Sequence, residues 1–230
     1  MRSETSTGSI SVDDVTVERE GQPILRDVSI ELTTARIAVI GANGSGKSTF
    51  ARLLNGLVLP DAGRVTVHGL DSRRDVKALR RRVGFVFTDP QAQILMPTPA
   101  EDLALSLRGS SRADVDRRVA AALAEHGLTD RADVPASELS GGQKQMLALA
   151  SVLITEPQLI VADEPTTLLD LRNSRRISDL LLDLPAQVVI VTHDLELAAR
   201  CDHAVLFEAG SIIASGAPPD VVAEYRELAA

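Results

Sequence analysis

The segment Gly41–Ser48 limits the possible folds of this chain most strongly, because it matches G-x-x-x-x-G-K-[ST] directly after the apolar run Ile37–Ile40. The pattern predicts a buried strand, a glycine-rich turn and a helix whose first N–H groups surround a polyphosphate. We expect Lys47 to reach the β- and γ-phosphates and Ser48 to ligate Mg²⁺. The full set of expected phosphate-binding residues is Gly41, Ala42, Asn43, Gly44, Ser45, Gly46, Lys47, Ser48 and Thr49. The alternative is a glycine turn before an ordinary amphipathic helix.

Composition narrows the class of protein. The 230 residues are 44 % hydrophobic, which is ample for a core, and no apolar run approaches the ~18 residues that a membrane-spanning helix needs. The net charge of −8 argues against a general nucleic-acid binder, and the triplet Arg80–Arg82 is better explained as a solvated helix end. A single cysteine, Cys201, excludes an internal disulfide, and the polar start Met1–Ser9 lacks the apolar part of a secretion signal. We therefore expect a cytoplasmic protein.

The hydrophobic pattern predicts an α/β fold. Alternating or continuous apolar runs predict strands at 10–17, 24–32, 37–40, 63–68, 83–87, 159–162, 188–191, 204–207 and 212–214. Helical periodicity predicts helices from 47 to about 55, then at 99–107, 112–126, 141–155, 169–182, after Asp194 and at 219–229. We expect one nucleotide-binding domain, 1–230, with no appended regulatory domain. Its ATP-binding core is 1–87 and 156–230, with a parallel sheet and an antiparallel β subdomain, and 88–155 is an inserted helical subdomain.

Two carboxylates follow a second apolar strand. Leu159–Ala162 leads directly into Asp163 and Glu164, as expected for a buried strand whose carboxyl end opens on the nucleotide. This is a Walker B pattern, in which Asp163 holds Mg²⁺ and Glu164 orients and deprotonates the attacking water. The alternative is a strand that ends in two solvated acids.

A second anion-binding helix start is predicted at Ser140, Gly141, Gly142 and Gln143. A Ser-Gly-Gly sequence entering an amphipathic helix directs N–H groups and the positive end of the helix dipole toward an anion. One protomer cannot place both helix starts on one γ-phosphate if they lie on different subdomains. Head-to-tail dimerisation, with Ser140 of one chain on the ATP of the other, is the economical interpretation. In isolation the pentapeptide 139–143 would be an ordinary serine N-cap.

The ordered set of motifs resembles the ATP-binding cassette (ABC) ATPases, a P-loop NTPase family, over nearly the whole chain. These motifs are Gly41–Ser48, Leu139–Gln143, Leu159–Glu164, Thr167–Asp170 and Thr192–Asp194. The resemblance implies that Asp170 lies at a dimer seam, that His193 contacts the γ-phosphate and attacking water, and that ATP closes the dimer. The stretch Val83–Pro99 is similar to energy-coupling-factor transporter ATPases, with the nearest likeness to those of biotin uptake systems.

Two positions depart from the wider family. Thr88 stands where most members carry a glutamine after the strand that ends at Phe87, and Gln91 and Gln93 are the alternatives for that role. We expect the Thr88 hydroxyl to keep the contact with Mg²⁺ or with water. Arg19 stands where an aromatic ring usually stacks on adenine, and its planar guanidinium can stack instead.

The leading interpretation is the Mg-dependent ATPase subunit of a membrane importer for a vitamin such as biotin, with import of cobalt, nickel or other vitamins as alternatives. The resemblance implies a homodimer, or a heterodimer with a sister ATPase, on the cytoplasmic face of the membrane beside T-type and S-type membrane components, without nucleic acid. An ABC ATPase acting on DNA or ribosomes is the runner-up. A regulator without turnover is expected to lack Glu164 or His193, and both are present.

Overall fold

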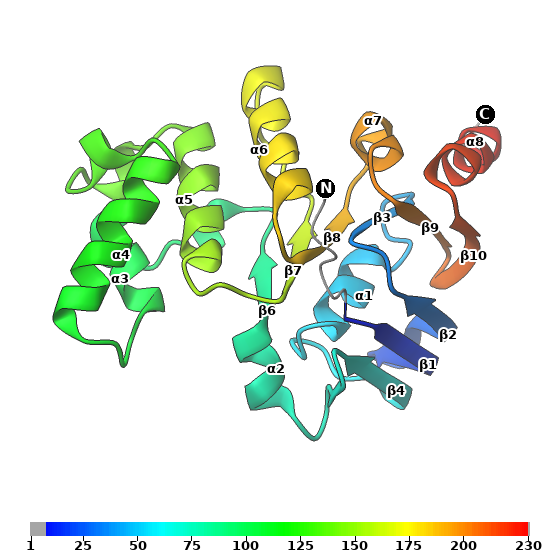
Figure 1. Ribbon diagram of the computed structural model, residues 1–230. Coiled ribbons are helices and arrows are strands. Elements are labelled where there is room, and N and C mark those ends of the chain that lie inside the picture. Colours follow the sequence, from blue (N-terminus) through cyan, green and yellow to red (C-terminus); the bar gives the residue numbers. More distant parts are fainter. Residues whose placement is uncertain (1–7, 230) are drawn as a thin grey trace, which may run out of the picture.

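The computed structural model describes residues 8–229, so Met1–Thr7, most of the polar start noted above, and Ala230 lie outside the described residues. Within 8–229 the strands form one sheet of six strands and one of four (Figure 1). The strands are β1 (Ile10–Arg19), β2 (Gln22–Leu32), β3 (Arg36–Gly41), β4 (Ala62–Val67), β5 (Leu70–Asp71), β6 (Val83–Val86), β7 (Leu159–Asp163), β8 (Gln187–Val191), β9 (His203–Glu208) and β10 (Ser211–Gly216).

The helices cover the six-stranded sheet and build one end of the molecule. They are α1 (Lys47–Leu53), α2 (Val76–Arg82), α3 (Pro99–Ser106), α4 (Arg112–Glu125), α5 (Gly141–Leu153), α6 (Leu171–Asp183), α7 (Leu195–Ala199) and α8 (Pro218–Leu228). Short 3₁₀ turns lie at Pro90–Ala92, Thr129–Arg131 and Ala136–Glu138. Figure 1 shows α3, α4 and α5 (green) together at one end, on the opposite side of the molecule from β1, β2 and α8. In residues 8–229 no helix combines the length and apolar character needed to cross a membrane.

The six-stranded sheet has the order β10-β9-β3-β8-β7-β6. From β9 to β6 neighbouring strands run parallel, and β10 is antiparallel to β9. The first parallel strand, β3, lies inside the sheet: the chain continues from it to β6 at one edge, returns through β7 to β8, and then crosses to β9 on the other side of β3. This is the arrangement in which a crevice opens at the carboxyl ends of the strands.

The second sheet, β2-β1-β4-β5, is antiparallel. Both sheets share a core, because alternate residues of β3 point to opposite faces. Ala38 and Ile40 pack with the core of α3 to α8, whereas Ile37 and Val39 pack with α1 and the antiparallel sheet. The phosphate-loop strand is therefore buried on both faces, which fixes the position of the loop that follows it.

The predicted α/β fold, with its parallel and antiparallel sheets and its helices at 99–107, 112–126 and 141–155, is confirmed, with element ends differing by a residue or two. Helix α2 was not predicted as an element, although its last turn is Arg80–Arg82, the expected solvated helix end. Seven residues with only Leu79 buried give too little periodic signal. The division into a core at 1–87 and 156–230 and a helical subdomain at 88–155 stays a prediction.

Candidate active site

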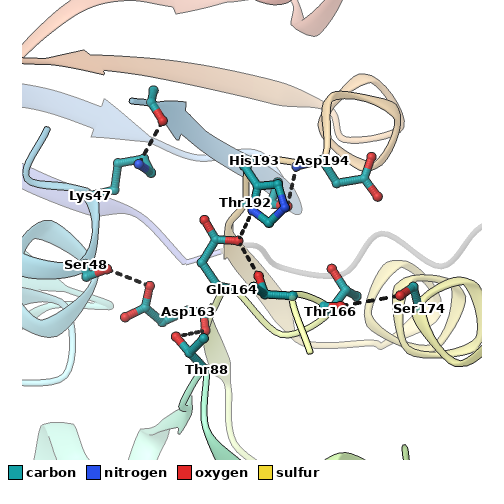
Figure 2. A network of polar contacts seen from close by, with 12 residues as sticks. Lys47, Ser48, Thr88, Asp163, Glu164, Thr166, Ser174, Thr192, His193 and Asp194 are labelled. Carbon is teal, nitrogen blue, oxygen red and sulfur yellow. Dashed lines mark hydrogen bonds and ion pairs between the residues drawn. The ribbon is translucent and has the colours of Figure 1, made fainter. Parts of the chain in front are cut away.

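The carboxyl ends of neighbouring parallel strands bring the predicted motifs to one edge of the sheet. Gly41 ends β3, Asp163 ends β7, and His193 follows β8. Thr88 follows β6, which pairs with β7. Segments far apart in the sequence therefore meet at the crevice, as expected for a parallel α/β sheet. Figure 2 shows Lys47, Ser48, Thr88, Asp163, Glu164 and His193 close to one another, with their polar contacts.

The phosphate-binding loop, Gly41–Ser48, turns back over its own strand. Gly41 has φ 140°, and a Cβ there would lie 2.1 Å from the Phe207 carbonyl oxygen, so only glycine fits. The buried Lys47 Nζ donates to the carbonyl oxygens of Gly41 and Ala42, both at 2.8 Å. Burial lowers the pKa of Lys47, while Glu164 and Asp163 act in the opposite direction. The loop thus holds a cation beside two carboxylates.

Ser48 and Asp163 form a direct pair. The Ser48 Oγ donates to Asp163 Oδ1 at 2.9 Å, and the Arg52 guanidinium lies 3.7 Å from Oδ2. Asp163 is only 1 % exposed, and burial raises its pKa despite these contacts. A buried carboxylate without full compensation attracts a cation. The pair therefore has the oxygen donors that a divalent metal site needs.

The backbone conformation of Glu164 fixes the position of its side chain. It has φ 52° although it is not glycine, and its N–H donates to the Val191 carbonyl oxygen at 2.9 Å, which ties it to the end of β8. Its Oε2 accepts from Thr167 Oγ1 at 2.9 Å and lies 2.7 Å from His193 Nδ1 (Figure 2). A strained backbone at a crevice carboxylate indicates a functional constraint. The contact between Glu164 and His193 joins the end of β7 to the end of β8.

ATP and Mg²⁺ fit the residues present. The Ser45 hydroxyl is buried in the phosphate-binding loop and has no hydrogen-bond partner among residues 8–229, and a phosphate oxygen would satisfy such a group. No three His, Cys, Asp or Glu side chains in the described chain are grouped closely enough to hold a metal. Mg²⁺ needs no such group, because it is commonly held by one or two carboxylates and by substrate phosphates.

The signature segment, Leu139–Gln143, starts α5. Ser140 is its N-cap: its side chain accepts from the Gln143 N–H at 3.3 Å, and the Gln143 side chain accepts from the Ser140 N–H at 2.9 Å. This capping box satisfies two backbone donors within the helix itself. Ser140 and Gly141 are exposed, and Figure 1 shows α5 separated from α1 by β6 and β7. One chain therefore holds its two predicted phosphate sites apart.

Asp170 lies beside the signature segment of its own chain. It caps α6, accepting from the Asn173 N–H at 2.9 Å and from Asn173 Nδ2 at 2.8 Å. The Asn173 N–H, the largest cause, lowers the pKa of Asp170. A Cβ on Gly142 would lie 2.6 Å from Asn173 Cγ, so Gly142 lets α5 and α6 approach closely at this point.

The remaining predicted residues are placed as follows. The Thr88 Oγ1 donates to the Asp163 carbonyl oxygen at 2.8 Å. The Gln93 side chain donates to the Ala148 carbonyl oxygen and accepts from the Phe87 N–H, so its amide is held on α5. Arg19 ends β1, opposite Gln22, and is exposed. The roles expected for Thr88 and Arg19 stay predictions.

Sequence reasoning missed two residues of the site. Arg52 lies four positions after Ser48 on α1, so the i, i+4 spacing could have placed it on the same face. Asn173 could have been found only as the third residue of a helix capped by Asp170. Its contact with Gly142 joins two helices and has no local signal.

Residues 25–167 match the family model described as ABC transporter. The chain belongs to the ABC transporter family. This ABC ATPase contains the expected motifs in the predicted order, with Gly41–Ser48, Leu159–Glu164 and Thr192–Asp194 at one edge of the parallel sheet and Leu139–Gln143 at the start of α5.

Its relatives include energy-coupling-factor and biotin-transport ATPases, which confirms the predicted subgroup. The biotin transport ATP-binding protein BioM of Rhizobium etli is 44 % identical over 208 residues, covering 90 % of this chain and 92 % of that one. The nickel import ATP-binding protein NikO of Rhodobacter capsulatus is 39 % identical over 240 residues, covering 96 % and 94 %. The solved structure of CbiO1 from Clostridium perfringens, part of an ABC transporter complex, superposes with TM-score 0.83 at 30 % identity and covers 96 % and 92 %.

Proposed function

We propose that this ABC ATPase is the ATP-hydrolysing subunit of an energy-coupling-factor importer for a vitamin such as biotin. The observation that carries the proposal is the crevice that joins Lys47, Ser48, Asp163 and Glu164, in a chain 44 % identical to BioM. The 39 % identity to NikO supports nickel import as the second candidate. Import of cobalt or of another vitamin is a further alternative.

Each of these residues has its own role in ATP hydrolysis. Lys47 neutralises charge on the β- and γ-phosphates, with the N–H groups of the phosphate-binding loop. Ser48 and Asp163 hold Mg²⁺, which shields the same phosphates when bound. Glu164 accepts the proton of the attacking water, and His193, 2.7 Å from its carboxylate, orients the water. Thr88, bonded to the Asp163 carbonyl, keeps the contact with metal or water, and Arg19 stacks on adenine.

The second half of each catalytic pocket comes from another subunit. Ser140 is exposed at the start of α5, on the far side of β6 and β7 from the chain's own phosphate-binding loop (Figure 1). A head-to-tail pair brings Ser140, Gly141, Gly142 and Gln143 of one subunit to the γ-phosphate on the other, with Asp170 at the seam. The second subunit is a copy of this chain or a sister ATPase.

The membrane partner docks beside the segment Thr88–Pro99. This segment lies between β6 and α3, and its Leu95 is 72 % exposed, so an apolar side chain is available there for contact with a partner. The partners are T-type and S-type membrane components, and the subunit lies on the cytoplasmic face. ATP-driven closure of the dimer then moves the docked helices.

Dimer trapping tests this function. Glu164→Gln removes the proton acceptor while keeping the side-chain shape, so the variant should retain MgATP and form a dimer on size-exclusion chromatography with light scattering. Glu156→Gln, at a carboxylate whose side chain is 82 % exposed, is the matched control and should turn ATP over and return to monomers. A Glu164→Gln chain that stays monomeric with MgATP at all protein concentrations contradicts the pair of identical chains and leaves only the pair with a sister ATPase, which must then copurify with the subunit.

The transported molecule is tested on the intact complex. Affinity purification of the tagged subunit from its native membrane should bring down hydrophobic membrane subunits. Binding of radiolabelled biotin to that complex supports the vitamin, and binding of ⁶³Ni²⁺ supports the second candidate. Copurified nucleic acid or ribosomes without a membrane subunit contradicts the transport function.

A further inference from the structure

Asp102 of α3 is a buried carboxylate outside the catalytic crevice. It is 3 % exposed and forms no ion pair with Lys or Arg among residues 8–229. Its Oδ1 accepts from the N–H groups of Leu95, at 2.8 Å, and Met96, at 3.1 Å, and its Oδ2 accepts from Ser151 Oγ at 2.7 Å. Three hydrogen bonds to one carboxylate compensate its burial. They also join the loop before α3 to helix α5.

A second contact joins the same loop to α5. The Gln93 side chain accepts from the Phe87 N–H at 3.1 Å and donates to the Ala148 carbonyl oxygen at 2.7 Å. Ala148 and Ser151 are three residues apart on α5 and lie on the same face. The loop Gln93–Pro97 is therefore held on α5 at two neighbouring positions.

The two ends of this connection have different roles in the proposed function. The loop carries Leu95, which has the largest exposed fraction among the large apolar side chains of the described residues. Helix α5 begins one residue after Ser140. A helix is stiff over its length, so a displacement at Ser151 reaches the signature segment with little loss.

We infer that Asp102 is a positioning residue that makes the loop Gln93–Pro97 and helix α5 move as one body, so that pressure of the membrane partner on Leu95 is transmitted to Ser140. The inference rests on the proposed function and adds to it a residue that touches neither nucleotide nor partner. A merely structural Asp102 would affect stability alone, whereas a positioning Asp102 also affects the response of the loop to ATP.

Hydrogen exchange followed by mass spectrometry separates these roles. Exchange is measured for Gln93–Pro97 and for α5 in the Glu164→Gln chain, with and without MgATP. Ser151→Ala removes one of the three hydrogen bonds to Asp102, and Asp102→Leu removes all three. Asp102→Asn keeps an acceptor oxygen for the N–H groups of the loop. Ser178→Ala, at a buried serine of α6, is the matched control. Thermal unfolding of each variant reports stability alone.

The expected result is a loop released from α5. In Asp102→Leu, the amides of Leu95 and Met96 should exchange at least about tenfold faster, because each loses a bond to a charged group that is worth about that factor. In Ser151→Ala these two bonds remain, and the expected effect is the loss of the link between the loop and α5. The loop should also lose its protection by MgATP while α5 keeps its own. Asp102→Asn should stay close to the parent chain. If Asp102→Leu does not fold, Ser151→Ala gives the decisive comparison.

Two outcomes overturn the inference in distinguishable ways. Suppose that MgATP slows hydrogen exchange in α5, and that it slows exchange in the loop of Ser151→Ala as much as in Ser178→Ala. The hydrogen bonds to Asp102 then transmit nothing, and the inference alone fails. If neither segment responds to MgATP in the Glu164→Gln parent chain, the proposed function fails, and the inference fails with it.

Discussion

The phosphate-binding loop and the signature segment are both glycine-rich helix starts, but they are built in opposite ways. At the phosphate-binding loop, Lys47 and Asp163 are buried, and Ser48 is bonded to Asp163, 115 residues away in the sequence. At the signature segment, Ser140 is exposed and its polar groups are satisfied by Gln143 of the same helix turn. The phosphate-binding half-site contains charged groups that a ligand must balance. The signature half-site is an exposed helix end whose own polar groups are already satisfied.

The largest expected effect is at the charged half-site. Lys47→Ala removes the buried cation, so the rate of ATP hydrolysis should fall by at least about 10²–10³-fold, the usual cost of one preorganised group at a developing charge. Lys77→Ala, at an exposed lysine of α2, is the control and should hydrolyse ATP at the parent rate. Steady-state phosphate release measures both. A Lys47→Ala chain with near-parent activity would contradict a catalytic role of the phosphate-binding loop.

A smaller effect is expected from packing at the signature segment. Gly142→Ala places a Cβ 2.6 Å from Asn173 Cγ, so α5 or Asn173 must shift, and the free energy of unfolding should fall by about 1–3 kcal/mol. At Gly141 an added Cβ meets nothing within 4 Å, so Gly141→Ala should leave the free energy of unfolding nearly unchanged. Urea unfolding compares the two. Equal stabilities would show that the close approach of α5 and α6 is not required.

The smallest expected effect distinguishes the carboxylates of the two half-sites by pH. Hydrogen bonds lower the pKa of Asp170 below its ordinary 3.8 in the folded chain, so its stabilising contribution is present above pH 3.8 and is lost as pH falls through the lower value. Burial raises the pKa of Asp163, so its protonated form favours folding, and that contribution is lost as pH rises through the raised value.

Unfolding of two variants checks these signs. At neutral pH without Mg²⁺, Asp163→Asn should be more stable than the parent and Asp170→Asn less stable. The pH dependence of MgATP binding should follow Asp163, because its charged form holds the metal. Two carboxyl groups that titrate at the same pH in NMR spectra would contradict the comparison.

The fold and the charged half-site could be predicted because their signals are local. Gly41–Ser48 and Leu159–Glu164 are contiguous, and each follows an apolar strand that must end at the same sheet edge. Ser48 and Asp163 were both expected at the metal, but the direct hydrogen bond between them, and that between Ser151 and Asp102, could not be predicted. Ser48 and Asp163 are 115 residues apart, and Asp102 and Ser151 are 49 apart. Only the folded chain shows which hydroxyl meets which carboxylate.

The structure confirms the signature segment as a helix start, whereas its role as half of a shared pocket stays a prediction. Its capping box explains Ser140 and Gln143 without any ligand. Its assignment as an anion site depended on the other motifs and on the separation of α5 from α1, which the structure supplies (Figure 1). A site built by two chains would leave no complete pattern in either chain.

The most direct test of the shared pocket is a mixing experiment with two inactive variants. Lys47→Ala inactivates the phosphate-binding loop and Ser140→Arg blocks the signature segment, so each variant alone should lack ATPase activity. In a mixed dimer, one pocket combines the intact loop of one chain with the intact signature segment of the other. Equal amounts should therefore recover about a quarter of the parent activity, since half of the dimers are mixed and each has one intact pocket. A mixture no more active than its two components would contradict the account.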